Sequence, residues 1–215
     1  MWYYLYRRYR GVEINWFHSN TKFLLDGYPR SGNTYFSGLS KKVFNPEIFI
    51  HHFHCIAAVK IALSRDLPSF ILIRNPADAI SSYYLKSFAL KNKKLSKDTD
   101  KELVLKLTND YYTFHKYILN NQTNLEIVTF ESTINNPNKI LDLLNERVFD
   151  NKYVVTHEQI SEFNREYRGA TDTLGSSRPN KTKERLKLGI KEALYDLDIY
   201  NDCHQIYLEL SHKSK

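Results

Sequence analysis

A short apolar run followed by a glycine-containing turn constrains the fold of this chain more than any other feature. The run Phe23-Leu24-Leu25 has the length and β-propensity of a buried strand. Residues 27–35, which follow it, read Gly-Tyr-Pro-Arg-Ser-Gly-Asn-Thr-Tyr and lead into a predicted helix. The two glycines let the backbone turn sharply and bring its N–H groups close to an anion. Because the helix directs its positive end to the same place, the sequence predicts a phosphate-binding turn.

This turn differs from an ordinary nucleotide-binding loop in the position of its cation. A loop of the pattern G-x-x-x-x-G-K-[ST] carries a lysine after its second glycine, and here that position is Asn33. The cation lies inside the turn instead, at Arg30. A turn that keeps the backbone cradle but moves the cation indicates a phosphate-bearing donor other than an ordinary nucleoside triphosphate.

A second predicted strand ends in an arginine. Residues 71–73 (Ile-Leu-Ile) run directly into Arg74, and Pro76 then begins a predicted helix that carries Ser82. This arrangement places a guanidinium at the carboxyl edge of a parallel sheet, where ligands bind. The planar fork of arginine suits a terminal phosphate because it can make paired charge-assisted hydrogen bonds. The structural alternative for Arg74 is a salt bridge to Asp78 or to another nearby carboxylate.

Short apolar strands alternate with helices through much of the chain. We expect strands at Lys22–Asp26, Ile48–His52, Phe70–Ile73 and Leu125–Phe130, and helices at Asn33–Lys42, Ile56–Ser64, Ala77–Leu90, Lys101–Leu119 and from Asn136-Pro137 onward. This order predicts an α/β fold in three layers, with a mostly parallel central sheet, helices on both faces and the phosphate-binding turn at the carboxyl ends of the strands. The chain of 215 residues is expected to form a single domain.

The last third of the sequence is more polar. Residues 165–187 are rich in basic side chains and contain two glycines and a proline, so we expect a loop that leads into a helix from about Lys181. A final amphipathic helix is expected at Asn201–Leu210.

Charge and cysteine content exclude several classes of protein. The formal net charge of +7 favours anionic ligands. No recognition helix, zinc spacing or RNA-reading aromatic motif accompanies this charge, so we predict no nucleic-acid partner. Two cysteines, Cys55 and Cys203, make neither a disulfide framework nor a metal site. The aromatic and basic N-terminal segment lacks both a sustained apolar stretch and the order of a signal peptide, so we predict a cytoplasmic protein without an integral membrane segment.

Taken together, the two motifs resemble those of the sulfotransferases that use 3′-phosphoadenosine 5′-phosphosulfate (PAPS). The family signature Tyr-Pro-Lys-Ser-Gly-Thr-Thr-Trp is similar to residues 28–35, and Arg-Asn-Pro-x-Asp-x-x-x-Ser is matched by residues 74–82. A third segment, Phe-Glu-Ser-Thr at residues 130–133, is similar to the family's Tyr-Glu-Asp-Leu. The resemblance covers about residues 22–145. It implies a cofactor-binding core at about residues 20–147 and a helical C-terminal part at about residues 148–215.

The resemblance implies an activity and assigns the donor-binding residues. The activity is transfer of a sulfuryl group from PAPS to a hydroxyl or amine, which releases 3′-phosphoadenosine 5′-phosphate (PAP) and needs no metal. The implied ligands of the 5′-phosphosulfate are Arg30, Ser31, Gly32, Asn33 and Thr34, with Arg30 in place of the family's lysine. Arg74 and Ser82 would hold the 3′-phosphate, and Tyr35 replaces a tryptophan that stacks on adenine. The family's C-terminal signature is not legible, and Arg178 and Lys181 are candidate substitutes for its contacts to the 3′-phosphate.

Histidines gather at the end of the second predicted strand, where residues 50–54 read Ile-His-His-Phe-His. In many cytosolic members of the family this region is similar to Lys-Thr-His, with the histidine as general base. That match assigns the base to His54 and the lysine position to His52, and histidine suits the task because its ordinary pKa is about 6.5. Some branches of the family use a glutamate, which makes Glu47 an alternative base. Two further histidines, at positions 115 and 157, lie in predicted helical and polar surroundings and are interpreted as structural.

Two other functions stay open at this point. One is a P-loop kinase or nucleoside triphosphatase, which the missing lysine and the lack of an obvious magnesium-binding aspartate disfavour. The other is a non-catalytic nucleotide-binding protein of the same fold. The acceptor is a small molecule, a carbohydrate or a peptide, and the sequence does not choose among them or indicate an oligomeric state.

Overall fold

Four parallel strands form the central sheet in the part of the chain that the computed structural model describes, residues 17–44, 49–51, 53–90, 99–168 and 181–214. Their order across the sheet is β2-β1-β3-β4, and every neighbouring pair is parallel. The strands are β1 (Phe23–Gly27), β2 (Phe49–His51), β3 (Ser69–Ile73) and β4 (Glu126–Thr129). All four predicted strands are therefore present, each within one or two residues of its expected ends.

The expected helices are present, and the structure adds two, α6 and α8, that the list of expected helices does not contain. The helices are α2 (Asn33–Val43), α3 (Ile56–Ser64), α4 (Pro76–Leu90), α5 (Lys101–Asn120), α6 (Phe130–Asn135), α7 (Pro137–Phe149), α8 (His157–Arg168), α9 (Lys181–Tyr195) and α10 (Asp198–Ser211), with a short 3-10 turn at Gln122–Asn124. The expected start of the polar loop at Arg165 is wrong, because α8 continues through Arg168. The final helix also begins earlier than expected, at Asp198. Within the described segments, no helix combines the length and the apolar character needed to cross a membrane.

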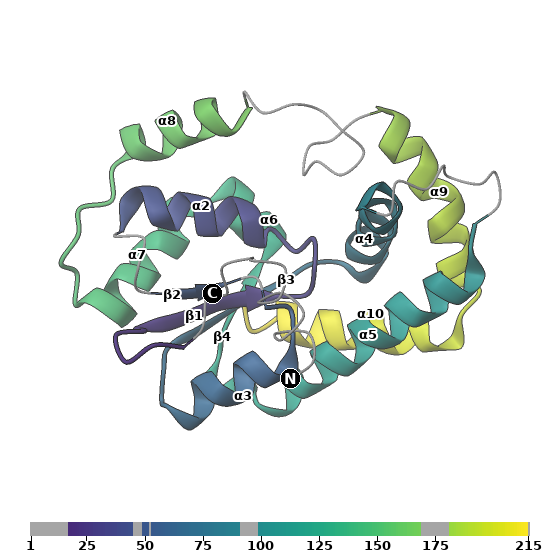
Figure 1. Ribbon diagram of the computed structural model, residues 1–215, viewed down its shortest axis with the longest axis horizontal. Coiled ribbons are helices and arrows are strands. Elements are labelled where there is room, and N and C mark those ends of the chain that lie inside the picture. Colours follow the sequence, from purple (N-terminus) through teal and green to yellow (C-terminus); the bar gives the residue numbers. More distant parts are fainter. Residues whose placement is uncertain (1–16, 45–48, 52, 91–98, 169–180, 215) are drawn as a thin grey trace.

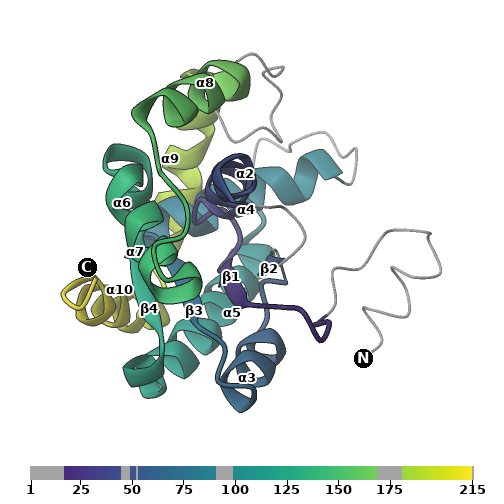
Figure 2. The same ribbon diagram turned by 90° about the vertical axis from the view of Figure 1, so that its left-hand side faces the viewer.

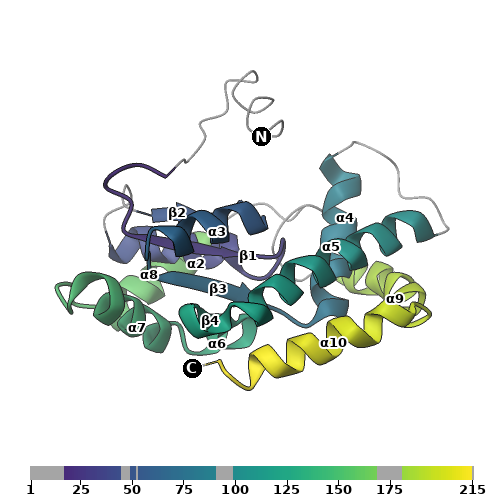
Figure 3. The same cartoon turned by 90° about the horizontal axis from the view of Figure 1, so that it is seen from below.

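Side chains of the strands alternate between two apolar cores, one on each face of the sheet. Leu24, Ile71 and Ile127 face a core that includes residues of α3, α4, α5, α9 and α10. Phe23 and Leu72 face the other core, which α2, α7 and α8 cover. Figures 1 and 2 show α2 and α8 on one side of the sheet and α3 on the other, and Figure 3 shows α10 alongside α5. Burial on both faces explains why the strands read as continuous apolar runs, and the predicted three-layer α/β fold is confirmed.

The topology brings two loops together at one point of the sheet edge. From β1 the chain passes through α2 to β2 on one side, then returns through α3 to β3 on the other side of β1. Strand order therefore reverses between β1 and β3, and the loops after their carboxyl ends diverge to opposite faces. In open α/β sheets such a switch point is where ligands bind. The turn after Gly27 and the arginine after Ile73 both lie here.

His115 departs from the expected polar surroundings. It is fully buried on α5, and its ring stacks on Tyr111 with centroids 3.8 Å apart. Its Nδ1 lies 2.9 Å from the Tyr111 carbonyl oxygen, whereas Nε2 is buried without a hydrogen-bond partner among the described residues. Burial lowers the pKa of His115 to about 4, although the hydrogen bond to the carbonyl acts in the opposite direction. His115 is thus a core residue held in its neutral form.

This buried histidine predicts a loss of stability in acid. The unfolded chain binds the proton below about pH 6.5 but the folded protein does so only near about pH 4, so the free energy of unfolding should fall as the pH drops through this window. Between about pH 7.5 and about pH 5 the expected loss from His115 is about 2 kcal/mol. Urea unfolding at both pH values measures it. The variant His115→Phe keeps a ring but cannot titrate, and an equal loss in this variant would assign the effect to other groups.

Candidate active site

Both glycines of the turn after β1 are required by the local structure. Gly27 pairs with Leu72 in the sheet, and a Cβ added at Gly27 would lie 2.2 Å from the Leu72 carbonyl oxygen. Gly32 has a φ of 95°, a conformation that favours glycine, and directly precedes α2. The amide Nδ2 of Asn33 donates hydrogen bonds to the carbonyl oxygens of Tyr28 at 3.0 Å and Gly27 at 3.4 Å. Asn33 therefore braces the turn from inside, at the position where an ordinary loop carries its lysine.

The two sequence motifs are in direct contact. Nε of Arg30 donates a hydrogen bond to Oγ of Ser82 at 2.9 Å, which joins the turn after β1 to helix α4. Nη1 of Arg74 donates to the carbonyl oxygen of Arg30 at 3.0 Å, which joins the same turn to the end of β3. Arg30 also has a positive φ of 73°, a strained conformation of the kind found at ligand-binding sites. Side chains predicted from two separate motifs thus form one cluster.

The guanidinium of Arg74 is held in place by aromatic residues. It lies over the ring of Phe130, with the guanidinium carbon 4.0 Å from the ring centroid. The hydroxyl of Tyr111 donates to the Arg74 carbonyl oxygen at 2.7 Å. The carboxylate of Asp78, the alternative partner of Arg74, instead accepts from Lys191 of α9 at 2.5 Å. Phe130 and Tyr111 therefore orient Arg74, and Asp78 pairs with Lys191 instead of Arg74.

Positive charges are crowded in this cluster. Burial lowers the pKa of Arg30, and the charge of Arg74 lowers it further. Burial also lowers the pKa of Arg74, although nearby carboxylates, led by Asp78, act in the opposite direction. Lys86 of α4 shows the same pattern, because burial and the charge of Arg30 both lower its pKa. Like charges held close together in a partly buried site favour the binding of an anion.

Buried donors at the same place fit the phosphates of a nucleotide. Ser31 Oγ and Arg74 Nε are buried and have no hydrogen-bond partner within the described part of the chain. An unpaired buried donor is costly unless a ligand satisfies it. Helix α2 starts without a side-chain cap and has no acidic residue in its first turn. Its first N–H groups, which helix geometry leaves unpaired within the helix, therefore add further donors for an anion.

The candidate base lies against the turn and a buried carboxylate. Nδ1 of His54 is 2.6 Å from the Gly27 carbonyl oxygen and 3.4 Å from Oδ1 of Asp26, and the His54 backbone N–H donates to Oδ2 of Asp26 at 2.8 Å. Since a carbonyl oxygen only accepts, Nδ1 carries the proton and Nε2 is the basic nitrogen. His54 has a φ of 53°, a further strained conformation in this region.

Asp26 is a site residue that the sequence reasoning missed. It is fully buried near the end of β1, where its Oδ2 accepts a hydrogen bond from the His54 backbone N–H and its Oδ1 lies 3.4 Å from the His54 ring. The available signal was a carboxylate inside a strand that is otherwise apolar, since a buried aspartate needs a partner.

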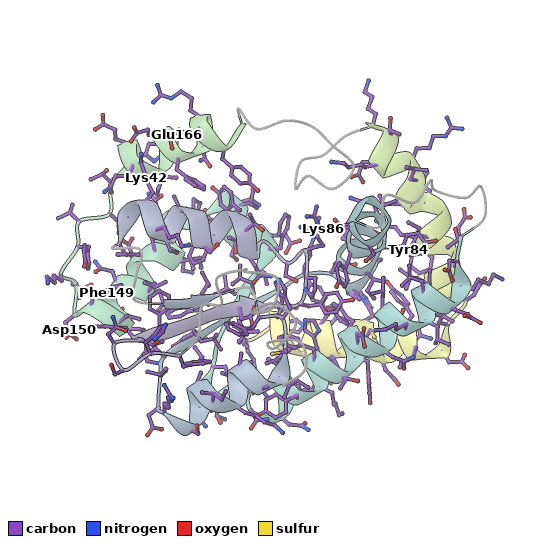
Figure 4. All side chains as sticks on the ribbon, in the orientation of Figure 1. Lys42, Tyr84, Lys86, Phe149, Asp150 and Glu166 are labelled. Atoms are coloured by element: carbon purple, nitrogen blue, oxygen red, sulfur yellow. The ribbon has the colours of Figure 1, made fainter. Side chains whose placement is uncertain are left out.

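Tyr35, the predicted adenine platform, is covered by α8. Its ring packs edge-on against Phe163 and Tyr167, with centroids 5.5 Å and 5.3 Å away, and its hydroxyl donates to Asn164 at 2.8 Å. Lys42 of α2 adds a salt bridge to Glu166 of α8 at 3.3 Å (Figure 4). Only 8% of Tyr35 is exposed, so stacking on adenine requires α8 to shift, and this role stays a prediction.

Several predicted residues contribute less to the described site. His52, Glu47 and Arg178 lie outside the described residues, and Lys181 is exposed at the start of α9. Two lysines of α9 that the sequence reasoning missed are buried: Lys183 and Lys187. Thr34 is exposed at the start of α2, and the searched residues hold no cluster of three metal-binding side chains.

Comparison with solved structures identifies a similar fold, whereas sequence comparisons find no match. No protein-family model matches the chain, and no curated protein matches it. Among solved structures, the crystal structure of mouse sulfotransferase SULT7A1 complexed with PAP is similar, with a TM-score of 0.57 and 11% sequence identity. The match covers 87% of this chain and 90% of the mouse chain. The protein therefore has the fold of a sulfotransferase, as the two motifs predict.

Proposed function

We propose that this protein transfers a sulfuryl group from PAPS to a hydroxyl or amine of an acceptor. The observation that carries the proposal is the contact between the two motifs, in which Arg30 bonds to Ser82 and Arg74 bonds to the backbone of Arg30. This contact gathers cations and buried donors at the switch point of the sheet. The similar mouse sulfotransferase was crystallised with PAP, which supports the same donor here.

The residues of the turn and of α4 divide the work of binding the donor. When bound, PAPS supplies an activated sulfuryl group on its 5′-phosphate. Arg30, Ser31 and the N–H groups at the start of α2 hold the 5′-phosphosulfate, and Arg30 stabilises the negative charge that develops on the departing phosphate. The Nε of Arg74 and the hydroxyl of Ser82 bind the 3′-phosphate.

His54 acts as general base in this proposal. Its Nε2 accepts the proton from the acceptor hydroxyl as the new oxygen–sulfur bond forms and the bond from sulfur to the 5′-phosphate oxygen breaks. The Gly27 carbonyl fixes the tautomer, and the carboxylate of Asp26 stabilises the imidazolium that results. His54 is thereby attached to the same turn that holds the leaving group.

Calorimetric titration with three nucleotides tests the proposal. We expect PAP to bind at least about tenfold more tightly than 5′-AMP, because the 3′-phosphate gains charge-assisted hydrogen bonds from Arg74. ATP with magnesium is the third ligand. Preference for ATP with magnesium, or no binding of PAP, would contradict the proposal and favour a kinase or a degenerate fold.

A further inference from the structure

Lys86 is a cation near the candidate site that neither sequence motif includes. It lies on α4 four residues after Ser82, so both side chains leave the same face of the helix. Four residues of a helix rise about 6 Å, so Lys86 lies about one turn farther along α4 than Ser82. Figure 4 shows Lys86 on the side of α4 that faces α2, opposite Tyr84. Tyr84 is buried in the core, so the position of this face is fixed by packing.

The surroundings of Lys86 differ from those of Arg74. Arg74 lies close to the carboxylates of Asp78, Glu131 and Glu184, which partly balance its charge. Lys86 is half-buried, and the charge that acts on it is the positive charge of Arg30. No acidic side chain among the described residues forms a salt bridge with it. Burial and the charge of Arg30 both lower the pKa of Lys86, so an anion placed beside it would relieve an unfavourable arrangement.

We propose that Lys86 binds an anionic group of the acceptor, so that the preferred acceptors carry a negative charge near the hydroxyl that is sulfated. This inference rests on the proposed function. In the proposed function, the donor's phosphates bind to the turn, Arg74 and Ser82 at the edge of the sheet. Lys86 lies about one turn farther along α4 than Ser82, and close enough to Arg30 to feel its charge, so an anionic group beside Lys86 would lie near the sulfuryl group that Arg30 holds in the proposed function.

Matched pairs of acceptors test the inference. 4-Hydroxyphenylacetate and 4-hydroxyphenylacetamide have nearly the same shape and differ in charge, and methyl glucuronoside and its carboxamide provide a second pair. Turnover with PAPS gives kcat/KM for each compound, and calorimetry gives its affinity for the PAP complex. In the parent protein we expect the anionic member of at least one pair to be favoured by about tenfold to 100-fold.

Two substitutions at Lys86 separate charge from shape. Lys86→Met keeps the length of the side chain but removes its charge. The ratio of kcat/KM between the anionic and the neutral acceptor should then fall to within about twofold of unity. Lys86→Arg keeps the charge and should retain most of the preference. Lys106→Met removes an exposed lysine of α5 and is the matched control, expected to behave like the parent protein.

The outcomes distinguish failure of this inference from failure of the proposed function. Failure of PAP to bind the parent protein would contradict the proposed function. Normal PAP binding without a preference for either anionic compound, in turnover and in affinity, would overturn the inference alone. A preference for the anionic acceptor that persists in Lys86→Met would also overturn the inference. If Lys86→Met instead weakens PAP binding as much as loss of Arg74 does, Lys86 belongs to the donor site and the inference is wrong.

Discussion

Replacing His54 with asparagine is expected to lower kcat by about 10²–10⁴-fold while PAP affinity stays within about threefold of the parent value. Asparagine cannot serve as a general base, but it tolerates the positive φ of 53° at this position better than most residues. The variant should therefore fold normally and lose mainly the proton acceptor. Single-turnover kinetics with PAPS and an active acceptor, combined with PAP titration, separate the two effects.

His157→Asn is the matched control for this experiment, because His157 is exposed at the start of α8 and touches no part of the proposed site. It should retain the turnover of the parent protein. If His54→Asn also retains full turnover, the base lies elsewhere, and His52 is the next residue to replace. A loss of PAP binding equal to the loss of turnover would mean that His54 supports the turn through its contact with Gly27 and is not the base.

The strands and the two binding motifs could be predicted because their signals are local. Leu24 and Leu72 lie in unbroken apolar runs, which is how strands buried on both faces read. The turn at Gly27 and the arginine at position 74 each follow such a strand directly. Once the strand order is known, the switch point brings them together. Local pattern and topology thus account for most of the proposed donor site.

The contacts that orient these residues could not be predicted, because they join segments far apart in the chain. Asp26 lies on β1 but fixes His54, which follows β2, and no local pattern links the two. The stack of Arg74 on Phe130 joins the ends of two neighbouring strands through a side-chain contact. The polar surroundings expected for His115 are wrong, because the tertiary packing of α5 buries this residue. Its own face of α5 points into the aromatic core.

The C-terminal part was predicted less well for a related reason. Helix α8 is polar along most of its length, so its last residues, 165–168, read as loop. A few side chains, among them Phe163, fasten it to α2 through Tyr35. When only a narrow apolar stripe packs a helix against the core, its hydrophobic periodicity is weak in a segment rich in charged residues. The burial of Tyr35 under α8 could not be predicted from the sequence for the same reason.

Replacing Arg74 with alanine should weaken PAP binding by about 30-fold or more, because the 3′-phosphate loses a charged partner in a partly buried site. The side chain has a second task, since its Nη1 holds the Arg30 carbonyl oxygen and so helps to shape the turn. Loss of that contact would weaken every nucleotide that uses the turn, with or without a 3′-phosphate. Affinity for PAP alone therefore cannot assign the role of Arg74.

The ratio of PAP to 5′-AMP affinity separates these two tasks. If Arg74 binds the 3′-phosphate, Arg74→Ala should reduce the ratio to within about threefold of unity, because the two nucleotides differ in that group alone. Arg74→Lys keeps the charge but loses the paired donors and the stack on Phe130, so it should give an intermediate ratio. Ser82→Ala, which removes one hydroxyl, should lower the ratio by about tenfold or less. Equal weakening of both nucleotides by Arg74→Ala would instead show that Arg74 serves the turn, and the 3′-phosphate partner would have to be sought among the buried lysines of α9.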